Sequence, residues 1–217
     1  MIEDERERLV QRALARIELE TRRVDERCAR EPLYWLQNHT HTENERHLER
    51  GVPFRQPFPK KRYLEVVMRY MRNEKRLFIA KSREMMTSWL AMGFATHQAQ
   101  WQQGALVLVQ TEKEDKVKAL IRYCSILYHN QESWLKERHL LAGESTTEIS
   151  WANRSRIIGV PKGEHQVRLY HPTLYIIDEA AFLPEFRECY NAAHPVAGQI
   201  IAISSAAPGP FAEECER

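Results

Sequence analysis

Four short apolar runs punctuate the chain after residue 76. They occupy residues 77–80, 105–109, 174–177 and 200–203, and each is apolar at consecutive positions. Residues 89–101 and 113–128 instead repeat their apolar positions at helical intervals. Strands that are apolar on both sides and alternate with helices are typical of a parallel sheet covered on both faces. The pattern therefore predicts an α/β fold. Residues 147–150 and 156–160 favour two shorter strands, which could form a hairpin around residues 152–154.

The N-terminal part follows a different pattern. Residues 3–30 predict one highly charged helix with a single apolar stripe. Such a helix could be a solvated helix packed on the body or an arm that binds a partner or DNA, and its interleaved acidic and basic residues favour the first. Residues 31–61 have little periodicity and predict a loop-rich lead-in, and residues 62–73 predict a helix. We accordingly divide the chain into residues 1–31, 32–76 and 77–217.

Composition narrows the functional classes. The 217 residues carry a formal net charge of +2, so any nucleic acid would bind a local patch rather than a globally basic body. The charged N-terminus does not resemble a signal peptide, and no apolar stretch reaches the length of a membrane span. The four cysteines show no CxxC spacing and indicate buried or incidental thiols. We expect a cytoplasmic protein with no membrane contact.

Polar side chains follow the apolar runs where ligands usually bind. Lys81-Ser82, Asp178-Glu179 and Ser204-Ser205 each end one run, and Gln110-Thr111 ends the fourth. In parallel α/β sheets, ligands bind at the carboxyl ends of the strands. We therefore expect these groups to converge on one site.

The adjacent carboxylates Asp178 and Glu179 are the most informative pair. Burying two acids at a strand end is costly unless they are used. In phosphoryl transfer, an aspartate at a strand end holds Mg²⁺ or its waters, and a second carboxylate can activate the attacking water. The alternative is a strand end whose acids cap the next helix. The long apolar run before Asp178 and the small Ala180 and Ala181 after it favour the catalytic interpretation.

The segment from Lys81 to Ser88 has the context of a phosphate-binding loop without its usual sequence. A GxxxxGK[ST] loop aligned on Ser88 places Lys81 and Met86 at the two glycines and Thr87 at the lysine. The order of strand, polar turn and helix is nevertheless correct. Lys81 and Arg83 could supply cations to a phosphate from the turn. An ordinary strand-to-helix turn is the alternative.

Together these residues resemble the ATPase domain of the large terminase subunit, the DNA-packaging motor of tailed bacteriophages. Residues 81–90 resemble its deviant Walker A loop. Its Walker B block is matched by Ser155, Arg156, Arg168 and residues 173–182. Its coupling motif is matched by Ser204-Ser205-Ala206. Met86 stands where the family has a loop glycine, and Glu84 stands where it has glutamine. The resemblance implies a RecA-like P-loop NTPase fold of the ASCE class, with a mainly parallel central sheet flanked by helices and an N-terminal helical extension.

The resemblance also implies roles for single residues. The nucleotide would be ATP with Mg²⁺, Asp178 and Ser88 would hold the metal, and Glu179 would activate water. Arg168 would act as an arginine finger on the nucleotide of a neighbouring subunit. The nucleotide-binding residues would be Lys81, Ser82, Arg83, Glu84, Met85, Met86, Thr87 and Ser88, with Ser204 and Ser205 sensing the γ-phosphate.

Partners follow from the same resemblance. They would be double-stranded DNA, the portal protein, the small terminase subunit and further copies of the chain in a ring, at the procapsid vertex in the host cytoplasm. The family's full-length proteins continue into a nuclease domain, and no nuclease activity is expected from these residues. Two other interpretations stay open. One is a DNA-binding or assembly scaffold with a degenerate phosphate loop, and the other is a DExx-type helicase, for which no second RecA-like domain is visible.

Overall fold

The core of the molecule is a mixed sheet between two layers of helices. The computed structural model describes residues 2–216, with side chains from residue 5 onward. Within them lies a seven-stranded sheet whose first five strands are parallel to one another. The last two strands are added by antiparallel pairing, each with the strand before it in the sheet. In sheet order the strands are β3 (Arg76–Lys81), β9 (Gln199–Ser205), β8 (Leu174–Asp178), β4 (Leu106–Gln110), β7 (Arg156–Val160), β6 (Glu148–Trp151) and β5 (Leu141–Glu144). The expected mainly parallel sheet is confirmed.

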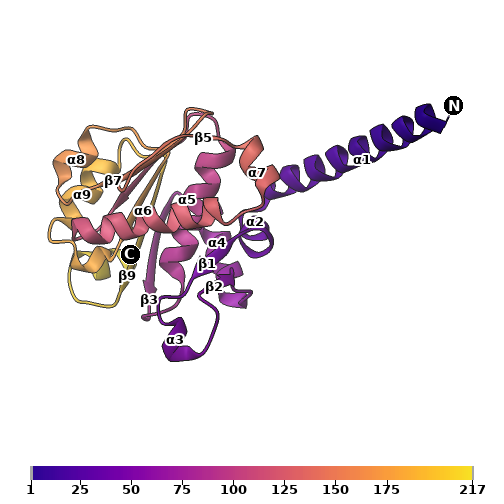
Figure 1. The fold of residues 1–217 in the computed structure, drawn as a ribbon. Helices are drawn as coiled ribbons and strands as arrows, with labels where there is room; N and C mark the ends of the chain where they lie inside the picture. Colours follow the sequence, from indigo (N-terminus) through magenta and orange to yellow (C-terminus); the bar gives the residue numbers. More distant parts are fainter. Residues whose placement is uncertain (1, 217) are drawn as a thin grey trace.

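Alternate residues of the buried strands serve two separate cores. On β8, Leu174 and Ile176 face one cluster, while Tyr175 and Ile177 face the other. One face is covered by α2 (Pro32–His39), α4 (Arg62–Asn73), α5 (Thr87–Trp101) and α6 (Glu114–His129). The other face is covered by α8 (Glu164–Arg168), the 3₁₀ turn η1 (Ala180–Phe182), α9 (Phe186–Ala193) and α10 (Pro210–Cys215). Burial on both faces explains why these strands are apolar throughout (Figure 1).

The segment expected to be loop-rich is more structured than its sequence suggested. It contains α2, the antiparallel pair β1 (His41–Glu43) and β2 (Arg55–Pro57), and α3 (His47–Arg50). α2 begins at Pro32, a favourable first helical position, and buries Trp35 and Leu36 completely. A Cβ at Gly93 of α5 would lie 2.5 Å from Leu36 Cδ2, so glycine permits this close approach. The expected 152–154 hairpin is confirmed, whereas α7 (Ser133–Arg138) and β5 were not predicted.

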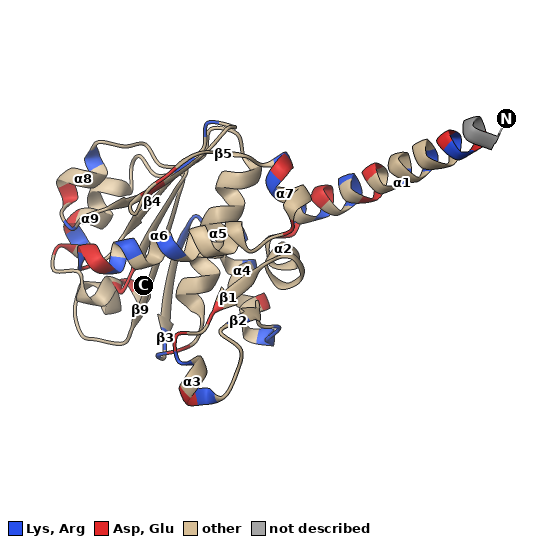
Figure 2. Ribbon diagram, in the orientation of Figure 1, with Lys and Arg blue, Asp and Glu red and all other residues tan. Residues whose placement is uncertain are grey.

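The N-terminal helix α1 (Ile2–Arg30) projects from the body as a long rod (Figure 1). Acidic and basic residues are mixed along its described part (Figure 2). The sequence favoured a helix packed on the body, and this expectation is wrong for all but the C-terminal part, because most of the apolar stripe faces solvent. Only its C-terminal part is packed, with Cys28 fully buried and Val24 against the core. Leu9, Leu14 and Ile17 are more than half exposed. None of the helices described between residues 2 and 216 combines the length and apolar character that crossing a bilayer requires.

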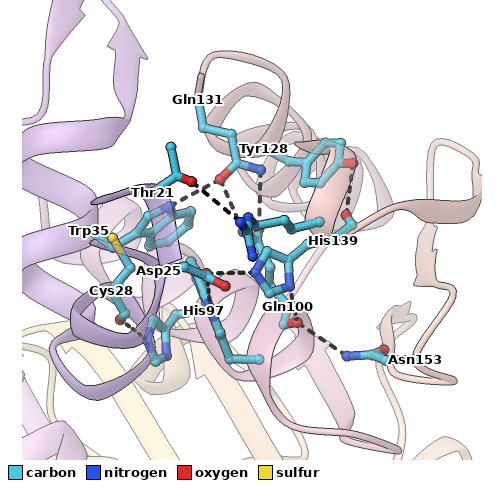
Figure 3. Close-up of polar contacts among 12 residues, drawn as sticks. Thr21, Asp25, Cys28, Trp35, His97, Gln100, Tyr128, Gln131, His139 and Asn153 are labelled. Atoms are coloured by element: carbon cyan, nitrogen blue, oxygen red, sulfur yellow. Dashed lines mark hydrogen bonds and ion pairs between the residues drawn. The ribbon is translucent and has the colours of Figure 1, made fainter. Parts of the chain in front are cut away.

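A buried polar network fastens the end of α1 to the body (Figure 3). Asp25 Oδ1 accepts a hydrogen bond from Trp101 Nε1 at 2.9 Å and lies 2.9 Å from His139 Nε2. Because a carboxylate only accepts, His139 carries a hydrogen on Nε2. His97 Nε2 likewise donates to the carbonyl of Cys28 at 2.8 Å, and burial lowers the pKa of His97 to about 4. These contacts join α1 to α5 and to the residue after α7.

A second part of the network joins Gln100, Gln131 and Trp35. Gln100 and Gln131 exchange two amide hydrogen bonds of 3.1 and 3.2 Å, and Trp35 Nε1 donates to Gln131 Oε1 at 3.1 Å. This arrangement ties α2 to α5 and to the turn that follows α6, and moving α2 would leave the buried indole N–H of Trp35 without its acceptor.

We predict that Asp25→Ala destabilises the fold by about 1–3 kcal/mol, because it leaves two half-buried donors without their charged acceptor. Burial alone would raise the pKa of Asp25, but the hydrogen bonds from His139 and Trp101 outweigh it and lower that pKa. The stabilisation is therefore present above the unfolded-state pKa and is lost as pH falls through the lowered value. Urea unfolding at neutral and acidic pH measures it. Glu20→Ala, which breaks only the exposed Arg16–Glu20 pair, is the control and should change stability by less than about 0.5 kcal/mol.

Candidate nucleotide site

Four neighbouring parallel strands bring the predicted polar residues to one edge of the sheet. In the order β3, β9, β8 and β4, Lys81 pairs with Ser205 and Asp178 pairs with Ile203, while Gln110 pairs with Ile177. β9 thus lies between the strand that ends in Lys81 and the strand that ends in Asp178. The predicted convergence of these strand ends is confirmed at the level of the backbone.

The central contact of this edge joins Ser88 to Asp178. Ser88 lies in the first turn of α5, and its Oγ donates a hydrogen bond of 2.8 Å to Asp178 Oδ2, 90 residues away in sequence. The first helix after β3 and the end of β8 are therefore fixed against each other. The two residues assigned to metal binding from the sequence are in direct contact.

The environment of Asp178 suits a divalent cation. The side chain is buried, and Oδ1 has no hydrogen-bond partner among the described residues. Burial raises the pKa of Asp178, while the hydrogen bond from Ser88 and the positive charge of Lys81 oppose that rise. No group of three or more His, Cys, Asp or Glu side chains suited to a metal gathers in the described part of the chain. Mg²⁺ fits this donor set, since it keeps several waters and takes further ligands from substrate phosphates.

Glu179 adopts a strained backbone and is held by a lysine. Its φ of 55° lies in the left-handed region, which costs energy for a residue other than glycine. Its Oε2 forms an ion pair with Nζ of Lys116 on α6. Lys116 Nζ also lies 2.6 Å from Glu112 Oε1, so one ammonium group bridges two carboxylates. Lys116 on α6, itself paired with Glu112 in the loop before that helix, thus holds the side chain expected to activate water.

The segment after β3 lines a cavity of about 510 Å³. Lys81, Glu84, Met85, Met86, Thr87 and Ser88 all contribute to its wall. Two of them, Glu84 and Met86, have φ of 60° and 56°. The loop therefore adopts left-handed conformations that glycine normally provides, although it has no glycine of its own. Tyr63 of α4 donates from its hydroxyl to the carbonyl of Met85 at 3.1 Å and supports this conformation.

The other predicted residues lie at varying distances from this cavity. Ser82 and Arg83 are exposed, and they are not part of the described cavity wall. Ser204 is fully buried, and its Oγ accepts a hydrogen bond of 3.1 Å from the backbone N–H of Ala181, two residues after Glu179. Ser205 is half-buried at the end of β9.

Arg168 lies apart from these residues within one molecule. It is exposed on α8 and pairs with Glu164 at 2.8 Å, and it does not line the cavity. A side chain in that position is accessible to a second molecule, as a finger acting in trans requires.

Several residues near the site were given no individual role from the sequence. Gln56 lines the cavity from the lead-in segment, where proline obscures periodicity. Trp89 and Tyr123 also line it and stack with ring centroids 4.0 Å apart, although they lie on different helices. Lys116 is one of many cations in the sequence, and nothing in its neighbourhood distinguishes it. Its contact with Glu179 spans 63 residues, and no local pattern encodes such a pairing.

Solved structures of known proteins resemble this fold, whereas sequence comparisons find no match. No protein-family model and no curated protein matches the chain. The ATPase domain of the Thermus phage P74-26 large terminase matches with a TM-score of 0.58 and 15% identity, covering 72% of this chain and 69% of that one. A mutant of that domain matches with a TM-score of 0.55 and 14% identity over the same fractions of the two chains. The large terminase of bacteriophage HK97 matches with a TM-score of 0.59 and 11% identity, covering 82% of this chain and 37% of that one.

These likenesses define the class of fold. The chain has a RecA-like α/β fold, as the sequence resemblance implied. More particularly, the fold is the one adopted by the ATPase domains of phage large terminases.

We predict that Asp178→Asn stabilises the protein and abolishes any effect of Mg²⁺ on its Tm. The substitution removes the buried charge of Asp178, whose pKa is raised by burial. The amide oxygen of asparagine can still accept the hydrogen bond from Ser88. A gain of about 1 kcal/mol would raise Tm by about 2–4 °C for a chain of this size. Differential scanning calorimetry without nucleotide measures the effect, and Mg²⁺ should not shift Tm of the variant in the presence of ATP. A lowered Tm would contradict the assignment of Asp178 as a destabilising functional charge.

Proposed function

We propose that this chain is the ATP-hydrolysing motor domain of a phage large terminase, which drives double-stranded DNA into a procapsid. The observation that carries the proposal is the hydrogen bond between Ser88 and Asp178 at the edge of a terminase-like sheet. It joins the phosphate loop to the metal-binding strand, as nucleotide hydrolysis requires. The buried Oδ1 of Asp178, which has no hydrogen-bond partner among the described residues, supports the same function.

The residues divide the chemistry among them. Lys81 and the N–H groups at the start of α5 would bind phosphate oxygens, since a helix N-terminus and a nearby cation both favour anions. Ser88 Oγ and Asp178 would hold Mg²⁺, which when bound neutralises charge on the triphosphate. The stacked rings of Trp89 and Tyr123 and the amide of Gln56 line the cavity and could contact the base.

Glu179 is the general base of this proposal. It must orient a water and accept its proton, and for this it has to exchange Lys116 for water. Ser204 could couple the loss of the γ-phosphate to the position of Glu179. Its Oγ accepts a hydrogen bond from the backbone just after Glu179, and it lies on the neighbouring strand β9. A shift of β9 on loss of the γ-phosphate would then be transmitted to the catalytic loop, which is the sensing role expected of Ser204 and Ser205.

The remaining parts of the function involve other molecules. The exposed Arg168 would reach the nucleotide of a neighbouring copy in a homo-oligomeric ring. An arginine finger supplied in this way is worth about 10³–10⁵ in rate, so an isolated subunit would hydrolyse ATP slowly. The ring would act on DNA at the procapsid vertex in the host cytoplasm, with the portal protein and the small terminase subunit as its partners.

We expect Glu179→Gln to lower kcat for ATP hydrolysis in the presence of double-stranded DNA by about 10²–10⁴, because the amide cannot accept a proton. Binding of MgATP should be retained, since the charge lost is not a phosphate ligand. Phosphate release measures turnover, and Glu188→Gln on the exposed face of α9 is the matched control. Turnover equal to that of the parent protein in Glu179→Gln would remove Glu179 from the mechanism.

Nucleotide binding separates this function from a non-catalytic scaffold. The loop conformation without glycine is the feature that favours the scaffold. Calorimetry with MgATP should show binding that Lys81→Ala abolishes or weakens by at least about tenfold, as expected for a charge-assisted phosphate contact. An absence of binding in the parent protein would favour the scaffold.

A further inference from the structure

The lead-in segment reaches the phosphate loop from outside the sheet. α3 and the residue before it lie between β1 and β2, and Figure 1 shows α3 beyond the end of β3. The base of this segment is fastened to α6 and to the turn after it. Arg122 pairs with Glu43 at 3.1 Å, and Arg55 donates to the carbonyl of Asn130 at 3.3 Å. The tip is therefore held over the cavity from a fixed base.

Two arginines at this tip converge on one carboxylate of the phosphate loop. Arg46 lies 2.8 Å from Glu84 Oε1, and Arg50 lies 2.8 Å from Glu84 Oε2. All three side chains line the same cavity as Lys81 and Ser88. Glu84 is also the residue that stands where the resembled family has a neutral glutamine. The two guanidinium groups and the single carboxylate leave one positive charge in excess at the wall of the proposed nucleotide site.

These ion pairs contribute too little to stability to account for the arrangement. The side chains of Arg46, Arg50 and Glu84 are 59%, 48% and 58% exposed. Pairs this exposed contribute about 0–1 kcal/mol, because water and salt screen them. A ligand with several negative charges can displace such contacts. Phosphate suits guanidinium groups particularly well, since the fork of N–H donors matches two of its oxygens.

The phosphate loop lacks the groups that these arginines could supply. Thr87 occupies the position of the usual loop lysine, and Met86 that of a glycine whose backbone approaches the phosphates closely. Lys81 is the loop cation that lines the cavity within the described residues, and Arg83 is exposed and is not part of its wall. A triphosphate bound here would therefore have fewer donors from the loop than in a standard site.

We propose that Arg46 and Arg50 bind the outer phosphates of the nucleotide, and that Glu84 holds both guanidinium groups at the cavity until the nucleotide displaces it. This inference rests on the proposed function and deepens it. The lead-in segment is then part of the binding site, and the contact selects for the number of phosphates. Nucleoside triphosphates gain most from it, and monophosphates gain least.

The test is calorimetric binding of MgATP, MgADP and AMP to the parent chain, to the double variant Arg46→Ala/Arg50→Ala and to Glu84→Gln. We expect the double variant to bind MgATP at least about tenfold more weakly, with the loss falling from MgATP to MgADP to AMP. Glu84→Gln should bind MgATP about two- to fivefold more tightly, because the amide neither repels phosphate nor competes for the arginines. This gain does not depend on how well the double variant folds.

Arg12→Ala/Arg16→Ala on the projecting part of α1 is the matched control. It removes the same charge and one exposed Arg–Glu pair far from the cavity, and should leave all three affinities unchanged. MgATP binding by Arg46→Ala/Arg50→Ala within twofold of the parent protein would overturn the inference. If Lys81→Ala still weakens MgATP binding, the proposed nucleotide site itself stands. A parent protein that binds no MgATP would overturn both. A weaker affinity in Glu84→Gln would also reject the displacement of Glu84 by phosphate.

Discussion

Parallel pairing of β3, β9, β8 and β4 is the constraint on which the candidate site depends. Parallel strands in register end at the same edge, so Lys81, Ser205 and Asp178 arrive there from segments 27 to 124 residues apart. The helix that must follow β3 then presents Ser88 to Asp178. The hydrophobic burial of both sheet faces holds this register, because a shift of one residue would turn each strand's two core faces toward the wrong helices.

The groups around this edge are held by residues outside the sheet. Lys116 fixes Glu179 from α6, Tyr63 supports the backbone of Met85 from α4, and α3 brings two arginines to Glu84. Three of the four described non-glycine residues with positive φ, Glu84, Met86 and Glu179, lie in these two loops. Backbone strain concentrated at the residues of a site and supported by a rigid core is typical of functional sites.

The sequence predicted the parts of the molecule that repeat locally. The strands β3, β4, β8 and β9 were visible as apolar runs, and Asp178 and Glu179 were recognisable because they end one of them. α2 was missed because eight residues that begin at a proline carry too few helical turns to show a period. Lys116, Arg46 and Arg50 could not be assigned, because their roles come from contacts across 34 or more residues. Gln56 could not be assigned, because only the fold brings it to the cavity wall. Exposed cations look alike in sequence, and only the fold distinguishes them.

The partial anchoring of α1 has a mechanical consequence. The network around Asp25 grips the helix near one end, and about 30 Å of helix extends beyond Thr21 at 1.5 Å per residue. A rigid rod clamped at one end behaves as a lever. Small rotations of α5 or of the turn before β5 would be amplified into much larger displacements at the free tip. Forces applied to the tip would likewise be delivered to α5, the helix that begins at Ser88.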